Sequence, residues 1–65
     1  MSNIYLAESV FRIIRDRRKA IEDLILFDNV KNMEQYRELM GNLASLTHVE
    51  QELKSLLDKQ EQTDE

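Results

Sequence analysis

Five basic side chains fall within eight consecutive positions, and they give this chain its clearest means of binding a partner. They are Arg12, Arg15, Arg17, Arg18 and Lys19. Guanidinium and ammonium groups bind phosphates and carboxylates, so the cluster can form a site for nucleic acid or for an acidic protein. Arg12, Arg15 and Lys19 are spaced by three and four residues, which places them on one stripe of a helix. These three are therefore the candidate partner-binding residues.

The same cluster also fits a solvated helix face whose charges are matched by nearby acids. Oppositely charged residues stand three or four positions apart at Glu8–Arg12, Arg12–Asp16, Lys19–Asp23 and Lys19–Glu22. Side chains at these spacings are neighbours on a helix surface, so the sequence favours this simpler interpretation. The binding interpretation stays open for one reason. If the chain turns near residue 30, residues 12–19 lie level with about 42–49, a stretch without any acid.

Charge is distributed unevenly along the 65 residues, whose formal net charge is −4. Residues 1–31 hold six Lys/Arg and five Asp/Glu, a net of +1, whereas residues 32–65 hold three and eight, a net of −5. Non-specific nucleic-acid binding depends on excess positive charge, so this balance disfavours nucleic acid. We therefore expect a protein partner, with nucleic acid as the alternative.

The sequence contains no recognisable catalytic or metal-binding constellation. It has no cysteine and one histidine, His48, which stands four residues before Glu52. A metal site needs more ligands than this pair. There is also no Gly-rich phosphate loop, no nucleophile with its base and no carboxylate pair at identifiable spacing. We expect no enzymatic activity, no cofactor and no metal.

Two heptad stripes organise the chain. The first consists of Ile4, Ala7, Phe11, Ile14, Arg18, Ile21 and Ile25, and the second of Tyr36, Leu39, Leu43, Leu46, Glu50, Leu53, Leu57 and Gln60. The steps alternate between three and four residues, which is the a/d pattern of a coiled coil and predicts two α-helices. The sequence has no proline, and its one glycine is Gly41, so little interrupts the two helices.

The expected elements are a first helix over about 3–27, a turn over about 28–32, a second helix over about 33–60 and a flexible acidic tail over 62–65. Ser2 or Asn3 is the expected N-cap of the first helix. Asp and Asn residues, which favour turns over helix interiors, mark the connection. Asn32 followed by Gln35 resembles a capping box at the start of the second helix. Residues 1–61 would then form one helical hairpin.

An antiparallel hairpin buries a narrow stripe of each helix, but the first helix is apolar over about half of its circumference. The apolar residues beside the two seams include Leu6, Val10, Ile13, Leu24, Met40, Val49 and Leu56. Leaving five such side chains in water forgoes roughly 8–15 kcal/mol, as much as the whole stability of a typical domain. We therefore predict an all-α fold, a two-helix antiparallel hairpin that forms a homodimer as a four-helix bundle. One nearly continuous bent helix is the competing fold.

Arg18 and Glu50 occupy seam positions, where polar residues commonly set the register or the oligomeric state, so they are the candidate oligomer-specifying residues. With a turn near residue 30 they differ in level by about seven residues, roughly 10 Å, and we do not expect them to pair within one hairpin. They either meet across the dimer or reach solvent by their long stems. Gly41 faces away from the seam and marks a close approach, a bend or a tolerated surface glycine.

The start of the sequence has no signal-peptide pattern, and no apolar run approaches the roughly 18 residues that a membrane span needs. We therefore expect a soluble cytoplasmic protein without a membrane partner.

The heptads of residues 36–41 and 50–57, with the run 10–15, resemble the small helical proteins encoded by tailed bacteriophages. This resemblance implies a protein made in the bacterial host cytoplasm that acts in assembly or by binding another protein, and it assigns no functional residues. The hairpin is also similar in architecture to small plasmid RNA-binding bundles, without sharing a motif. We thus expect a non-enzymatic interaction or assembly protein. The alternative is a small nucleic-acid-binding or regulatory bundle that uses the basic cluster.

Overall fold

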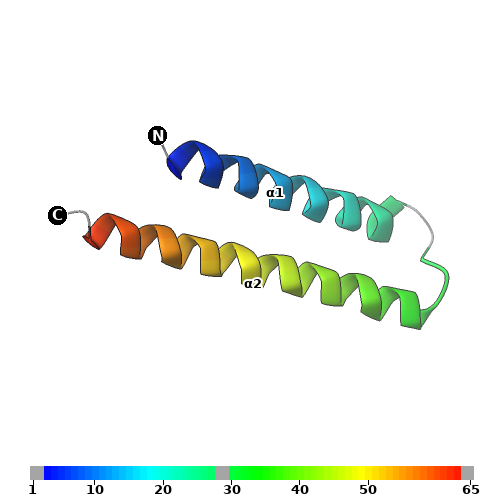
Figure 1. Cartoon of the computed structure of the whole chain (residues 1–65). Coiled ribbons are helices and arrows are strands. Elements are labelled where there is room, and N and C mark those ends of the chain that lie inside the picture. Colours follow the sequence, from blue (N-terminus) through cyan, green and yellow to red (C-terminus); the bar gives the residue numbers. More distant parts are fainter. Residues whose placement is uncertain (1–2, 28–29, 64–65) are drawn as a thin grey trace.

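Two antiparallel α-helices lying side by side make up the structure (Figure 1). The computed structural model describes residues 3–27 and 30–63, which contain α1 (Asn3–Phe27) and α2 (Met33–Thr63). The start of α1 and the end of α2 lie at the same end of the molecule, here called the open end (Figure 1). The predicted helical hairpin is confirmed, and the competing continuous bent helix is wrong.

The helix bounds agree with the sequence except at the end of α2. We predicted that α2 ends at about Gln60, but it continues to Thr63 and thus into the range 62–65 predicted as a tail. The physical reason is that neither glycine nor proline follows Gly41, and nothing in the last turns stops the backbone hydrogen-bond ladder. Tail residues 64 and 65, turn residues 28 and 29, and the candidate cap Ser2 lie outside the described residues.

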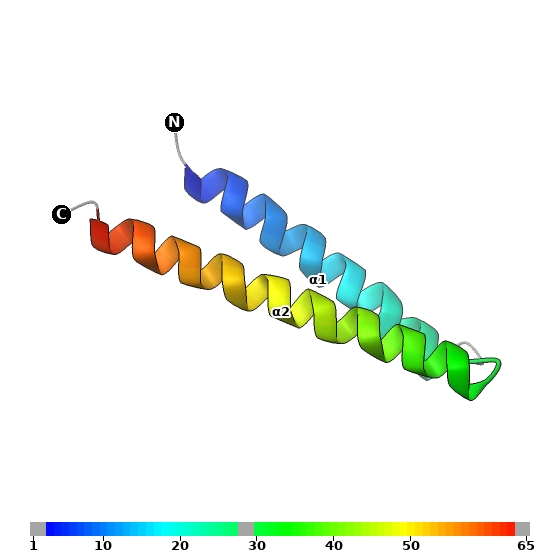
Figure 2. The ribbon, with the colours of Figure 1, turned by 60° about the horizontal axis from the view of Figure 1, so that its bottom comes forward.

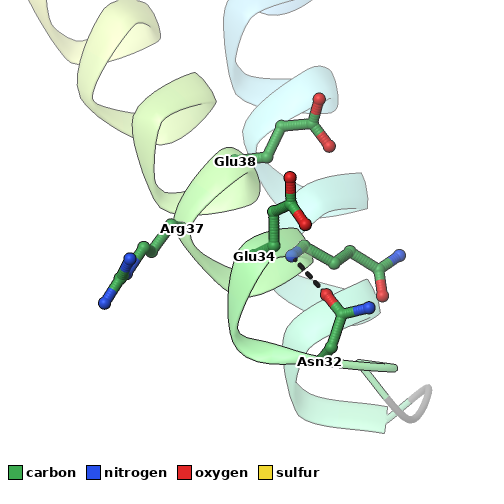
Figure 3. A pocket seen from close by; sticks show the side chains of 5 residues that line it. Asn32, Glu34, Arg37 and Glu38 are labelled. Carbon is green, nitrogen blue, oxygen red and sulfur yellow. Dashed lines mark hydrogen bonds between the residues drawn. The ribbon is translucent and has the colours of Figure 1, made fainter.

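Side-chain caps define the start of α2, as the sequence predicted. The backbone N–H of Gln35 donates to Oδ1 of Asn32 at 2.8 Å (Figure 3), and the backbone N–H of Lys31 donates to Oε1 of Gln35 at 2.7 Å. The first helical hydrogen bond runs from the Tyr36 N–H to the Asn32 carbonyl oxygen at 3.1 Å. This is a capping box in which the reciprocal bond goes to the residue before the cap. It fixes where α2 begins.

The predicted seams lie between the helices. Buried or half-buried seam residues are Ala7, Phe11, Ile14, Arg18, Ile21 and Ile25 on α1, and Leu39, Leu43, Leu46, Glu50, Leu53 and Leu57 on α2. The expected end positions Ile4, Tyr36 and Gln60 are exposed instead, because a pair of helices cannot cover its own ends. The heptad pattern thus places the seam correctly except at its ends.

The core of the hairpin is very small. Among the described residues only Ala7, Ile14, Ile21 and Leu39 are buried, and Ile21 alone is almost fully enclosed. The molecule extends 51 × 17 × 12 Å along its principal axes, so it is a single layer of two helices. Figures 1 and 2 show the helices crossing at a shallow angle with no further element over either face. Most large apolar side chains outside the seam are therefore exposed within the described part of the chain.

We predict that Gly41→Ala stabilises the protein. Gly41 is helical and exposed, its φ is not positive, and a Cβ atom added there would meet nothing within 4 Å. Alanine should raise the free energy of unfolding by about 1 kcal/mol through its higher helix propensity. Urea denaturation followed by circular dichroism measures the change. A loss of stability instead would show that another helix approaches the backbone at this position.

Candidate interaction surfaces

Arg18 and Glu50 form an ion pair within one hairpin. The Arg18 guanidinium donates from Nη2 to Oε1 of Glu50 at 2.7 Å. The two side chains are 24% and 18% exposed, so the pair lies at the edge of the seam between α1 and α2. Our expectation that these residues do not pair within one hairpin is therefore wrong. Each satisfies the charge of the other without a second chain.

The position of the turn brings Arg18 and Glu50 within reach of each other. Because α2 begins beyond the end of α1 (Figures 1 and 2), the turn is centred later than residue 30. Arg18 then lies level with about residue 46, which is roughly 6 Å from the level of Glu50. Long helical side chains lean toward the N-terminus of their own helix, so in an antiparallel pair these two lean toward each other. The remaining gap is within their combined reach.

The ion pair changes the acidity of Glu50. A hydrogen bond from Arg18 is the main reason that the pKa of Glu50 lies below its ordinary value of 4.5. The positive charges of Arg18, Lys54 and Arg15 lower this pKa further, whereas desolvation opposes the shift. The carboxylate form is thus favoured in the folded hairpin.

The candidate partner-binding residues lie along the exposed side of α1. Arg12 and Arg15 line a shallow surface hollow together with Glu8 and Phe11. Neither arginine has an ion pair in the described part of the chain, so the expected Glu8–Arg12 and Arg12–Asp16 pairs are not formed. Lys19 does pair with Asp23, at 3.6 Å between two exposed side chains. Such an exposed pair contributes little to stability.

The basic cluster of α1 lies level with acidic residues of α2. With the turn centred later, residues 12–19 lie level with about 45–52 rather than 42–49. That stretch contains Glu50, which takes the charge of Arg18, and Glu52. The expectation that the cluster faces a stretch without acids is therefore wrong.

A second shallow hollow surrounds the start of α2. Figure 3 shows Glu34 and Glu38 projecting on the side of the helix where Asn32 lies, and Arg37 projecting on the opposite side. Glu34 lies in the first turn, where a carboxylate complements the positive end of the helix dipole. The Asn32 side chain caps the Gln35 N–H, and Glu34 and Glu38 place negative charge beside the hollow, so the hollow is not suited to an anion.

Residues 3–27 and 30–63 contain neither a cluster of metal ligands nor a candidate membrane span. No three His, Asp or Glu side chains there gather as metal ligands. Neither described helix is long and apolar enough to cross a membrane.

Comparison with protein-family models, curated proteins and solved structures finds no match for this chain.

One surface of α1 was not singled out as a site from the sequence. It is a second apolar stripe, here called the outer stripe, made of Leu6, Val10, Ile13 and Leu24, with Arg17 and Ala20 at the remaining positions. Its steps alternate between four and three residues, as in the seam. This repeated spacing is the feature of the sequence that identifies the outer stripe, whereas the apolar arc alone indicates only surplus apolar surface.

We predict that the stability provided by the Arg18–Glu50 pair depends on pH. A carboxylate with a lowered pKa stabilises the folded state above the pKa of the unfolded chain, and this contribution is lost as pH falls through the folded pKa. Glu50→Gln should therefore be less stable than wild type at pH 7, with the difference shrinking below about pH 4.5. Thermal unfolding across this range measures the difference.

Asp58→Asn provides the control for this experiment, since Asp58 is an exposed acid on α2 without an ion pair among the described residues. Its effect should be small at every pH. A difference between wild type and Glu50→Gln that stays constant from neutral to acidic pH would contradict the role given to the ion pair.

Proposed function

We propose that this protein is a non-enzymatic interaction protein, a helical hairpin that self-associates and binds another protein. One observation carries the proposal. Twelve large apolar side chains are exposed among the described residues, while only four apolar residues are buried. A monomer with this distribution exposes more apolar side chains than it encloses. A chain of this size ordinarily needs a metal, a disulfide or another subunit to be stable.

The free energy gained by burying the exposed apolar side chains supports association. Burying a large apolar side chain contributes about 1.5–3 kcal/mol, so covering five of the exposed ones contributes roughly 8–15 kcal/mol. A typical domain has a total stability of about 5–15 kcal/mol. A second copy is the simplest source of cover, because it presents the same apolar surface and is present wherever the protein is made. A homodimeric four-helix bundle is the arrangement we propose.

The biological setting that we propose follows from the resemblance of the heptads to small helical proteins of tailed bacteriophages. In that setting the protein is phage-encoded and works in the cytoplasm of the bacterial host, in assembly or by binding a protein there. Arg12, Arg15 and Lys19 are the residues that we propose for the partner, because they lie together on the exposed side of α1. An acidic surface is the partner chemistry that they fit.

Sedimentation equilibrium tests the self-association. We expect a molecular mass above the 7.7 kDa of one chain at micromolar concentration, and unfolding that shifts to higher temperature as the protein concentration rises. The apolar surface left open by a single hairpin is the reason for both results. A folded monomer whose unfolding temperature is independent of concentration would rule out the proposal.

Nucleic-acid binding is the second candidate, and the hollow lined by Arg12 and Arg15 favours it, because neither guanidinium has an ion pair in the described part of the chain. If it operates, mobility shifts with DNA or RNA should appear at low salt and weaken steeply as salt is added. Arg12→Glu with Arg15→Glu should abolish them, whereas Arg37→Glu should not. The absence of any shift at low salt would end this candidate.

A further inference from the structure

The outer stripe of α1 repeats the geometry of the seam without a partner. Leu6, Ile13 and Leu24 are exposed, the first two by 64% and 66%, and Val10 is half-buried. At 3.6 residues per turn, the stripe is rotated by about 100° from the seam around the α1 axis. A helix with two apolar stripes at this angle can contact two neighbouring helices, and the hairpin supplies one of them.

Residues of α2 continue the outer stripe across the same face of the hairpin. In an antiparallel pair, the heptad positions just before the seam in one helix lie beside the equivalent positions of the other. For α1 these positions hold Val10 and Leu24, and for α2 they hold Val49 and Leu56, which are 49% and 62% exposed. The result is one apolar face, largest toward the open end, that spans both helices.

Two opposite charges lie near the middle of this face, while Glu38 and Lys59 occupy equivalent α2 positions toward its two ends. Arg17 occupies a position within the outer stripe, and Glu52 stands three residues after Val49 and four before Leu56, which makes it their neighbour on α2. Neither Arg17 nor Glu52 has an ion pair within the described part of the chain. Along the hairpin they are offset in nearly the same way as Arg18 and Glu50, which do pair.

We infer that a second copy of this chain docks on this face, with α1 of each copy against α2 of the other and Arg17 paired with Glu52 of the second copy. The inference rests on the proposed self-association and specifies its surface. Both hairpins then point the same way, with their turns at one end. This orientation superposes the two apolar faces at the same level and brings opposite charges together twice. Packing α1 against α1 in the reverse direction would instead place Arg17 beside Arg17 of the other copy.

Charge complementarity favours a second copy of this chain on the face, and it favours hairpins that point the same way. A two-fold axis parallel to the helices places Arg17 of each copy opposite Glu52 of the other. A repulsive like-charge contact disfavours the reverse orientation. The face is thus self-complementary in the placement of its apolar residues and in charge.

Charge reversal in two separate variants tests the inference. Arg17→Glu and Glu52→Arg should each weaken homodimer formation at least tenfold, since each places like charges opposite one another. A one-to-one mixture of the two variants should restore association to near wild type, because both contacts in the mixed dimer again join opposite charges. Sedimentation equilibrium at low salt measures association, and circular dichroism verifies that each variant is helical. Arg37→Glu and Asp58→Arg are matched controls away from this face and should leave association unchanged.

The possible results separate the explanations. If Arg17→Glu with Glu52→Arg in one chain restores association but the mixture does not, the two residues pair within a hairpin and the inference is wrong. If Arg17→Glu associates preferentially with wild type, arginine faces arginine and the orientation is wrong. If wild type associates and neither variant weakens it, the surface is wrong while the proposed self-association stands. A monomeric wild type would overturn both the docking surface and the proposed self-association.

A second measurement reads the orientation directly. The chain has no cysteine, so Lys31→Cys introduces one labelling site next to the turn. Hairpins that point the same way bring the two labels close together, and strong energy transfer is expected in the dimer. Hairpins that point in opposite directions separate the labels along the 51 Å length of the molecule, and weak transfer in a confirmed dimer would overturn the arrangement.

Discussion

Two helical rods can share one seam, and this constraint governs the rest of the structure. Each helix presents a stripe of its circumference to the other, so the hairpin encloses four apolar residues and leaves the remainder on its two faces. The molecule is one layer thick, and no further element lies over either face in the described part of the chain. Everything proposed about association follows from the mismatch between this narrow seam and the wide apolar arc of α1.

The Arg18–Glu50 pair lies within one hairpin, so its role differs from that of a polar residue that specifies an oligomer. A polar residue at a seam position commonly reports on oligomeric state, because it needs a partner there. Here the partner is on the neighbouring helix of the same chain, and the two charges fix how α1 and α2 are aligned along their length. Partial exposure lets the guanidinium and the carboxylate keep contact with water, which limits the desolvation cost of placing charges beside the seam.

The two faces of the hairpin differ in chemistry, and this difference gives each a separate role in the proposals. The face with the outer stripe of α1 is apolar toward the open end, with Arg17 and Glu52 as opposite charges near its middle, and suits a second copy of the chain. Arg12, Arg15 and Lys19 lie on the exposed side of α1 away from that stripe, beside a hollow that also contains Glu8. Docking of a second copy on one face therefore leaves the basic residues accessible for a different partner.

The sequence by itself determined the local structure. Heptad spacing, the Asn32–Gln35 cap and the lack of proline specify two helices and the residues between them, because helix formation and seam composition depend on neighbours within a few positions. Tertiary structure decided the alignment of one helix along the other. A shift of a few residues in the centre of the turn, together with the lean of long side chains toward the helix N-terminus, brought Arg18 to Glu50 and placed the basic cluster level with acids. The heptad pattern repeats every seven residues, so it does not fix how one helix is aligned along the other. The contacts near the turn and between the helices fix this alignment.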